Sequence, residues 1–256
     1  MTNAANFVWY DVMTDDVPAA EAFYRNVIGW TTRDASNADT PYTLFCQGEV
    51  MVGGLMPIPG DARAAGVRPA WMGYIGVADV DDYAKRVAAA GGAIYRQPTD
   101  VPDVGRFAVA ADPDGAGFML FSPKPSQFPP PAARPEAAGR FSWRELRAGD
   151  AERAFAFYSG LFGWTKAMAV DMGAMGTYQT FAAGGATIGG MMTKPADAPA
   201  HWGYYINVEA IDAAIARVER AGGTLLTGPH QVPTGEWMMN GRDPRGALFG
   251  LLAPRR

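Results

Sequence analysis

The 256-residue sequence predicts an α+β fold in which four βαβββ modules form two similar domains in tandem. Two observations support this prediction. The chain repeats itself in four blocks, and each half contains two cycles of a strand, a helix and further strands. Hydrophobic residues make up 48% of the chain and charged residues 19%, so each domain can bury a core.

The internal repeat is the clearest feature of the chain. Residues 7–30 align without a gap with residues 141–164, and both segments contain Phe-x-Trp, Ala-Phe-Tyr and Gly-Trp. Four blocks recur in the same order, which indicates a duplication. We therefore expect one domain over residues 1–122 and a second over residues 140–256. The other three pairs of blocks begin at Tyr42 and Tyr178, at Trp71 and Trp202, and at Asp112 and Asp243.

The segment between the repeats, residues 123–139, has the sequence PKPSQFPPPAARPEAAG. Proline fixes φ and lacks an N–H donor, so this segment cannot continue a helix or a central strand. We predict an extended, semi-rigid linker. A ligand for a proline-binding module is the alternative, but the position between two repeats already explains the segment.

The first module begins with an apolar and aromatic strand at Phe7–Val12. Asp16 can cap the following helix, and Gly29 suits the left-handed conformation that ends a helix. Strands follow at Tyr42–Gln47 and Val50–Met56. The apolar stripe of the helix consists of Ala19, Ala20, Phe23, Tyr24, Val27 and Ile28.

The second module repeats this cycle, with a strand at Trp71–Val77, a helix at Val80–Ala90 and a stop at Gly91 and Gly92. Its later strands are predicted at Ala93–Arg96, Phe107–Ala111 and Phe118–Phe121. The third and fourth modules have helices over about Asp150 to Phe162 and about Ile211 to Ala221, ended by Gly163 and Gly222. The spacing after each helix favours antiparallel meanders over a wound parallel sheet. The pairs Gly53-Gly54 and Gly189-Gly190 fall within strands, where they allow curvature or a close approach.

Composition excludes several classes of protein. A net charge of -4 argues against an electrostatic nucleic-acid binder, and no apolar stretch is long enough to span a bilayer. Cys46 is the only cysteine, so no internal disulfide is possible, and we expect a buried, inert thiol. No glycine pattern of the dinucleotide-binding type lies at a strand-to-helix turn. We therefore expect a cytoplasmic protein with neither a nucleic-acid nor a membrane partner.

Several motifs together resemble the vicinal oxygen chelate superfamily, which includes glyoxalase I, bleomycin-resistance proteins and extradiol dioxygenases. They are the segments Asp16 to Gly29 and Asp150 to Gly163, the segment Val77 to Asp81, and Asp-Pro-Asp-Gly at Asp112 to Gly115. More narrowly, the duplicated chain resembles two-domain glyoxalase-like proteins of bacteria. The resemblance implies that the curved sheets close into two cup-shaped, glyoxalase-like domains in tandem.

In metal-dependent relatives, four strand positions of the cup carry His, Gln or Glu. Indole and glycine offer no ligand atom, and thioether sulfur suits soft metals. When the family's ligand positions are carried over to this chain, the resemblance therefore implies a cup without a transition metal, and we expect no cofactor. The equivalent positions are Trp9, Gly54, Met72 and Met119 in the first half, and Trp143, Gly190, Gly203 and Gly250 in the second.

Residues two apart on a strand share a face, which predicts what lines each cup. For the aromatic side chains, core packing is the alternative to ligand binding. The first cup would contain Phe7, Trp9, Met56, Met72, Tyr74, Met119 and Phe121 as ligand-binding residues, with Asp11 beside them. The second would contain Phe141, Trp143, Met192, His201 and Tyr205, with Glu145 beside them.

Asp11 and Glu145 occupy the same place in the two repeats and are the candidate catalytic residues. A carboxylate buried beside tryptophan could act as a general acid or base, or bind a cationic ligand. A salt bridge or hydrogen bond at the strand end is the alternative. For His201 the alternative is bonding within a loop, and His230 is expected in a turn-like loop, GPHQVP.

Three functions stay open at this point. The first is a metal-independent protein that binds a small hydrophobic or aromatic molecule in an apolar cup. The second is a metal-independent lyase, isomerase or hydroxylase-like enzyme that uses Asp11 or Glu145. The third is a scaffold whose cups are filled by their own side chains. Two repeats in one chain imitate a dimer of single domains, so we expect a monomer or a homodimer.

Overall fold

The computed structural model describes residues 5–37, 40–124 and 137–256, so most of the predicted linker lies outside the described residues. In the first repeat the strands are β1 (Phe7–Thr14), β2 (Thr31–Asp34), β3 (Thr43–Gln47), β4 (Val50–Pro57), β5 (Ala70–Gly76), β6 (Ala93–Val101), β7 (Gly105–Ala111) and β8 (Gly117–Pro123). The helices are α1 (Val17–Ile28), α2 (Gly60–Ala64) and α3 (Val80–Ala89). The five-residue helix α2 was not predicted.

In the second repeat the strands are β9 (Phe141–Ala148), β10 (Thr165–Asp171), β11 (Thr177–Ala183), β12 (Ala186–Thr193), β13 (His201–Asn207), β14 (Thr224–Gln231), β15 (Trp237–Arg242) and β16 (Leu248–Ala253). The helices are α4 (Ala151–Phe162) and α5 (Ile211–Arg220), with a short 3-10 helix at Gly173–Met175. No helix of the described residues is long and apolar enough to cross a membrane.

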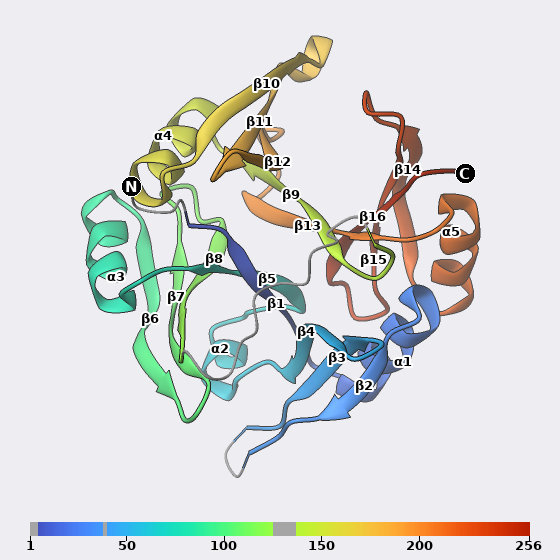
Figure 1. Cartoon of the computed structure of the whole chain (residues 1–256), viewed down its shortest axis with the longest axis horizontal. Coiled ribbons are helices and arrows are strands. Elements are labelled where there is room, and N and C mark those ends of the chain that lie inside the picture. Colours follow the sequence, from blue (N-terminus) through green and yellow to red (C-terminus); the bar gives the residue numbers. More distant parts are fainter. Residues whose placement is uncertain (1–4, 38–39, 125–136) are drawn as a thin grey trace. The chain divides into compact units, whose positions relative to one another are not determined.

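Two eight-stranded sheets have the same strand order, β2-β3-β4-β1-β5-β8-β7-β6 and β10-β11-β12-β9-β13-β16-β15-β14 (Figure 1). The predicted α+β fold of four βαβββ modules in two glyoxalase-like domains is confirmed. The last three strands of each module pair antiparallel, as predicted. In addition, the last strand of each module pairs parallel with the first strand of the same module. This parallel pair brings distant parts of each module side by side.

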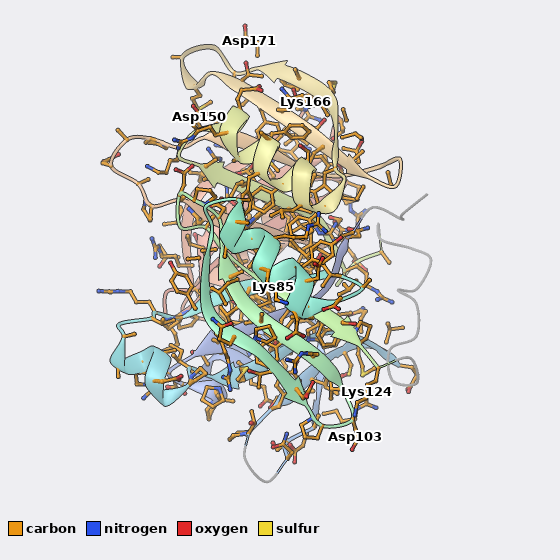
Figure 2. The ribbon with its side chains drawn as sticks, turned by 90° about the vertical axis from the view of Figure 1, so that its left-hand side faces the viewer. Lys85, Asp103, Lys124, Asp150, Lys166 and Asp171 are labelled. Carbon is orange, nitrogen blue, oxygen red and sulfur yellow. The ribbon has the colours of Figure 1, made fainter. Side chains whose placement is uncertain are left out.

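The helix ends follow the local sequence. The Asp16 carboxylate accepts a hydrogen bond of 3.1 Å from the backbone N–H of Ala19, and Gly29 ends α1 with φ of 88°. In α4 the Asp150 carboxylate accepts one of 2.9 Å from Arg153, and Gly163 has φ of 72° (Figure 2). The cap at Asp16 and the ends at Gly29 and Gly163 were predicted, because a cap depends only on residues within one turn. Asp150 was expected as the first residue of its helix, whereas the structure shows it as the N-cap.

The compact units of the structure do not coincide with the sequence repeats. The described part of unit 1 contains residues 5–9, 73–124 and 143–203, mainly the second and third modules. That of unit 2 contains residues 10–37, 40–72, 137–142 and 204–256, mainly the first and fourth modules. Each unit therefore combines modules from both repeats, while the boundaries proposed from the repeat remain a prediction.

Helices join the two modules within each unit. In unit 1, α3 contacts α4 (Figure 2). Arg86 of α3 donates a hydrogen bond of 3.0 Å to the carbonyl oxygen of Leu161 in α4. In unit 2, α1 contacts α5, and Arg217 donates one of 2.8 Å to the carbonyl oxygen of Val27. Each arginine thus satisfies a carbonyl group at the C-terminal end of the neighbouring helix.

A buried network of Trp, Tyr and Asp lies in the core of each unit. In unit 2 the Tyr24 hydroxyl accepts a hydrogen bond of 2.7 Å from the Trp71 indole and donates one of 3.1 Å to Asp243. In unit 1 the Tyr158 hydroxyl accepts one of 2.9 Å from the Trp202 indole and donates one of 3.2 Å to Asp112. All six side chains are buried. The family motifs Ala-Phe-Tyr and Asp-Pro therefore serve packing in this chain.

The prediction that His230 lies in a loop is wrong. His230 lies in β14, which stands at the end of its sheet. Proline is tolerated in edge strands because its missing N–H does not interrupt a second ladder. The pairing of β14 with β15 shifts register between Thr227 and His230, where Pro229 lies.

Candidate functional site

The first candidate site lies in unit 2 and is built around Asp11; we call it the Asp11 site, with Asp11, Met13, Tyr42, Gly54 and Met56. Asp11 of β1 pairs in register with Gly54 of β4, and Met13 pairs with Met56. The Tyr42 hydroxyl, just before β3, donates a hydrogen bond of 2.6 Å to Asp11 Oδ1. Asp11 is 2% exposed, whereas Tyr42 is half-buried.

Gly54 is required by this arrangement. A Cβ atom at this position would overlap the hydroxyl and ring of Tyr42 and the carboxylate of Asp11. The phenol of Tyr42 therefore occupies the space above Gly54, at a position where the resemblance places a metal ligand. The prediction that this glycine pair permits a close approach is confirmed, since a Cβ at Gly53 would also lie 2.8 Å from the carbonyl oxygen of Tyr10.

The equivalent site of the second repeat lies in unit 1. Gly190 of β12 pairs with Glu145 of β9, and a Cβ atom at Gly190 would overlap the ring of Tyr178. The Trp143 indole donates a hydrogen bond of 2.8 Å to the Tyr178 hydroxyl. Trp143 and Tyr178 are half-buried. We call this the Glu145 site, which contains Trp143, Glu145, Arg147, Tyr178, Gly190 and Met192.

Arg147 makes the two sites chemically different. Its Nε donates to Glu145 Oε1 at 2.7 Å, and its Nη1 donates to the sulfur of Met192 at 2.8 Å. The Glu145 side chain is 11% exposed and that of Arg147 is 29% exposed. The salt bridge that the sequence left open as an alternative is thus present for Glu145. The same position in the first repeat is Met13.

Phe7 and Phe141 lie in buried aromatic clusters. The ring of Phe7 packs edge-on against Trp202, with centroids 5.4 Å apart. Phe141 packs edge-on against Trp71 at 5.2 Å and stacks on Tyr10 at 4.0 Å. These contacts are the core packing that the sequence left open as the alternative to ligand binding.

The remaining candidates of the first cup are divided between the units. In unit 1, Tyr74 pairs in register with Met119 and packs edge-on against Phe121, with ring centroids 5.8 Å apart. Met119 and Phe121 are buried, whereas Tyr74 is half-buried. Trp9, which belongs to unit 1, and Met72, which belongs to unit 2, are also half-buried.

The remaining candidates of the second cup are His201 and Tyr205. Tyr205 is buried in unit 2, and its ring occupies the space above its register partner Gly250. His201, in unit 1, is half-buried, and its Nδ1 lies 3.1 Å from the carbonyl oxygen of Pro199. Bonding within the preceding loop, the alternative considered for this histidine, is thus present.

A divalent metal does not fit the residues at the positions where the resemblance places ligands. Tyrosine rings fill the space at Gly54, Gly190 and Gly250. Within the described residues, no group of three His, Cys, Asp or Glu side chains could hold a metal ion. The remaining side chains at these positions are indoles and thioethers, which do not bind hard cations. No chemistry of these sites is therefore assigned to a metal.

Three residues of these sites were not recognised in the sequence: Tyr42, Tyr178 and Arg147. The signal for the tyrosines was present, because each begins a repeated block that contains a glycine pair. Arg147 lies two residues after Glu145 on the same strand, so both side chains share one face. The alternation of the strand could have identified it.

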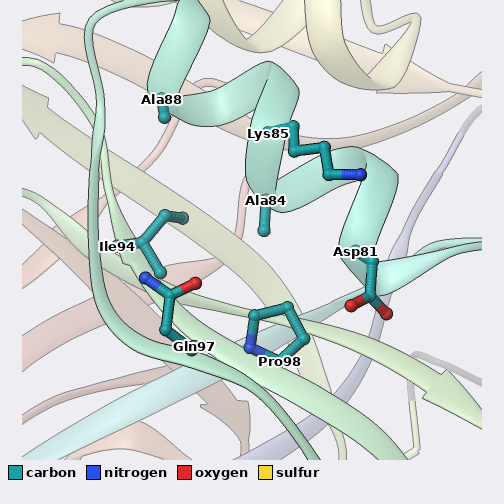
Figure 3. A pocket seen from close by; sticks show the side chains of 7 residues that line it. All are labelled: Asp81, Ala84, Lys85, Ala88, Ile94, Gln97 and Pro98. Atoms are coloured by element: carbon teal, nitrogen blue, oxygen red, sulfur yellow. The ribbon is translucent and has the colours of Figure 1, made fainter.

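A surface hollow of about 290 Å³ lies between α3 and β6 in unit 1 (Figure 3). Its floor is small and apolar, with Ala84, Ala88 and Ile94, and it contains none of the predicted site residues. The Asp81 carboxylate at its rim accepts hydrogen bonds of 2.7 and 3.0 Å from Arg106, which lower the pKa of Asp81. We assign no chemistry to this hollow.

Comparisons with known proteins agree with the fold. The family model of the Glyoxalase/Bleomycin resistance protein/Dioxygenase superfamily matches residues 6–120 and 140–251. A Mycobacterium tuberculosis protein named "Putative glyoxylase CFP32" is 31% identical over 249 residues, which cover 96% of this chain and 94% of that protein. The "Anthracycline biosynthesis protein DauV" of Streptomyces sp. is 29% identical over 265 residues, covering 96% of this chain and 92% of DauV.

Among solved structures, the Mn(II)-bound glyoxalase from Novosphingobium aromaticivorans superimposes with a TM-score of 0.64 at 16% identity. The superposition covers 98% of this chain and 82% of that one. At this identity the likeness supports the fold alone.

Proposed function

Because the chain belongs to the glyoxalase/bleomycin resistance protein/dioxygenase superfamily, we propose that it binds a small hydrophobic or aromatic molecule without a metal ion. The observation that carries this proposal is the Tyr42 hydroxyl, held 2.6 Å from the buried Asp11 carboxylate above Gly54. Where a metal-dependent relative would present a ligand, this chain presents a fixed phenol. A fixed, half-buried aromatic ring suits contact with a planar apolar ligand.

The composition of both sites supports this class of ligand. Each site combines a tyrosine ring above a glycine with a methionine two residues along the strand of that glycine, Met56 in β4 and Met192 in β12. Thioether side chains adapt to ligands of irregular outline, while aromatic rings stack on flat ones. The relative DauV is named for the biosynthesis of anthracyclines, compounds built on fused planar rings, which favours a polycyclic aromatic ligand.

The binding proposal is tested with 1,8-dihydroxyanthraquinone as a planar probe and 1-adamantanol as an apolar probe that is not planar. We expect calorimetric binding of the planar probe and none of the other. Tyr42→Phe removes the hydroxyl that Asp11 orients and should weaken binding about tenfold, the equivalent of one lost hydrogen bond. Tyr95→Phe changes a tyrosine that is 69% exposed and should leave the dissociation constant unchanged.

Two results would contradict the binding proposal. One is the absence of binding by the planar probe to the intact protein, and the other is equal binding of both probes. A crystal structure in which the side chains fill both sites completely would instead support the scaffold, the third function considered.

An enzyme without a metal is the second candidate, and one observation favours it. A buried carboxylate that accepts a hydrogen bond from a phenol could receive a proton from a bound substrate. Asp11 is the candidate for this role because it is 2% exposed and accepts a hydrogen bond from the Tyr42 phenol, whereas Glu145 forms a salt bridge with Arg147. Asp11→Asn should then abolish turnover of a bound compound while its binding persists, and unchanged turnover would exclude this role.

Cytoplasmic location, a monomeric or homodimeric state and the lack of nucleic-acid and membrane partners are also part of this proposal. The charge of -4 supports the lack of a nucleic-acid partner, and the single cysteine and the lack of a long apolar stretch support the location and the lack of a membrane partner. The oligomeric state rests on the two repeats in one chain, which imitate a dimer of single domains. Sedimentation of the purified chain, with and without the planar probe, measures its oligomeric state directly.

A further inference from the structure

The Glu145 site contains a cation, Arg147, where the Asp11 site has Met13, and this difference has a consequence for ligand choice. Arg147 Nε and Nη1 donate to Glu145 and to the sulfur of Met192, respectively. Among the described residues, the structure gives Nη2 no acceptor, and the side chain is 29% exposed. The Nη2 N–H groups of this guanidinium are therefore the candidates for contact with a ligand.

Glu145 holds the guanidinium in place. The pair is linked through Nε, which leaves the outer edge of the guanidinium plane directed away from the carboxylate. The bond from Nη1 ends on a thioether, which is a weak acceptor. A ligand oxygen that carries negative charge would be a stronger acceptor than this sulfur, because charge-assisted hydrogen bonds are about twice as strong as neutral ones.

The same face of β9 also carries an aromatic side chain. Trp143, Glu145 and Arg147 alternate along β9 and so share one side of the strand. Trp143 is tied to Tyr178 by a hydrogen bond of 2.8 Å, which fixes both half-buried rings. The planar body of a ligand and its charged oxygen would thus find separate partners within one site.

We propose that the Glu145 site selects planar aromatic ligands that carry a negatively charged oxygen, a carboxylate or phenolate, through Arg147. The inference rests on the proposed binding function and adds the charge of the ligand to it. Selection belongs to this site alone, because the equivalent residue of the Asp11 site is Met13, which offers no hydrogen-bond donor.

The test compares 2-naphthoate with 2-naphthamide, which has the same shape without the charge. Calorimetry on the intact protein should show about tenfold tighter binding of the carboxylate, as expected for hydrogen bonds to a charged group. Arg147→Gln should remove this preference while changing the amide's dissociation constant less than about twofold. Arg147→Lys should retain part of the preference for the carboxylate, because the positive charge remains but the planar, forked set of guanidinium donors is lost.

Two controls separate the ligand effect from a fault in folding. Arg153→Gln replaces an arginine of the same unit whose side chain is 70% exposed, and it should keep the full preference. Arg147→Gln leaves the Glu145 carboxylate without its partner. The double variant Glu145→Gln/Arg147→Gln removes both charges, and its melting temperature and probe binding are compared with those of Arg147→Gln. It should also bind the two probes equally.

The inference is overturned if the unaltered protein binds both probes equally, or if the preference survives in Arg147→Gln and in the double variant. In both of these cases aromatic binding itself stands. If the unaltered protein binds neither naphthalene probe nor 1,8-dihydroxyanthraquinone, the proposed function fails and this inference fails with it.

Discussion

The indole of Trp71 donates a hydrogen bond of 2.7 Å to the hydroxyl of Tyr24, deep in the core of unit 2. The same hydroxyl donates to Asp243, so a single phenol links strand β5 with the Asp-Pro turn of the other repeat. Burial and the neighbouring Asp243 carboxylate raise the pKa of Tyr24 well above 10, so the hydroxyl stays protonated and able to donate. Tyr158 repeats this arrangement in unit 1 with Trp202 and Asp112.

Removal of either phenol hydroxyl should destabilise the protein strongly. Tyr24→Phe leaves a buried indole N–H and a buried carboxylate without this partner, and we expect the free energy of unfolding to fall by about 1–3 kcal/mol. Tyr158→Phe should have a similar effect. Chemical denaturation followed by tryptophan fluorescence measures both, with Tyr95→Phe as the exposed control. A loss no larger than that of the control would show that the networks contribute little.

The two buried aspartates should make stability depend on pH. Burial raises the pKa of Asp112 and of Asp243 above the ordinary 3.8, although hydrogen bonds from backbone N–H groups and a tyrosine oppose this shift. The folded state therefore binds protons more tightly than the unfolded state. Their stabilising contribution is complete below pH 3.8 and is lost as pH rises through the folded pKa.

Asparagine variants test the direction of this dependence. Asp112→Asn and Asp243→Asn no longer titrate, so the unfolding free energy of each variant, minus that of the unaltered protein, should increase with pH. Urea titrations from about pH 4 to about pH 7 measure this difference. A difference that is constant, or that decreases with pH, would contradict a raised pKa in the folded state.

The sequence predicts local features well and misses those that depend on pairing across the fold. Asp16 and Gly29 bound α1 as predicted, because their partners lie within one helical turn. Asp112 was recognised only within a family motif and Asp243 only as the start of a repeated block, since their tyrosine partners lie 46 and 219 residues away in the chain. The division of the chain into units that mix the repeats is likewise invisible in the pattern of either repeat.

The candidate sites show the same limit. The repeat identified Asp11 and Glu145 as equivalent positions, but it could not show that one accepts from a phenol and the other from a guanidinium. For Asp11 the partner is Tyr42, which the pairing of β3 with β4 places over the carboxylate. For Glu145 the partner is Arg147, two residues along the same strand, which the alternation of β9 could have identified. From the sequence, Gly54 stood only for the absence of a metal ligand. The structure shows that the missing side chain at Gly54 leaves the space that the Tyr42 ring occupies.

Metal removal should have no effect on this protein. The positions where the family resemblance places ligands hold indole, thioether or glycine, so we expect well below one equivalent of transition metal after purification and dialysis. Treatment with EDTA should leave the melting temperature unchanged, because a bound metal would otherwise stabilise the folded state. Elemental analysis and thermal denaturation provide the two measurements. A stoichiometric metal that is lost to EDTA together with stability would contradict the absence of a ligand set.

A methyl group at Gly54 should break the contact between Tyr42 and Asp11. The added Cβ overlaps the phenol and the carboxylate, and the phenol is the more mobile of the two because it is half-buried. We expect Gly54→Ala to displace Tyr42 and to lower the free energy of unfolding by about 1–3 kcal/mol, as overpacking does. Binding of 1,8-dihydroxyanthraquinone should weaken in parallel with the loss of the hydrogen bond.

A double-mutant cycle distinguishes displacement of Tyr42 from a general fault in β4. Tyr42→Ala removes the side chain that the new methyl group would strike, so Gly54→Ala should cost much less stability in the Tyr42→Ala background. Gly53→Ala is the matched control, because its Cβ would meet the backbone carbonyl oxygen of Tyr10 at 2.8 Å. Loss of Tyr42 cannot relieve that contact, so its cost should be the same in both backgrounds. Additive effects of Gly54→Ala and Tyr42→Ala would show that the phenol does not occupy the space above this glycine in solution.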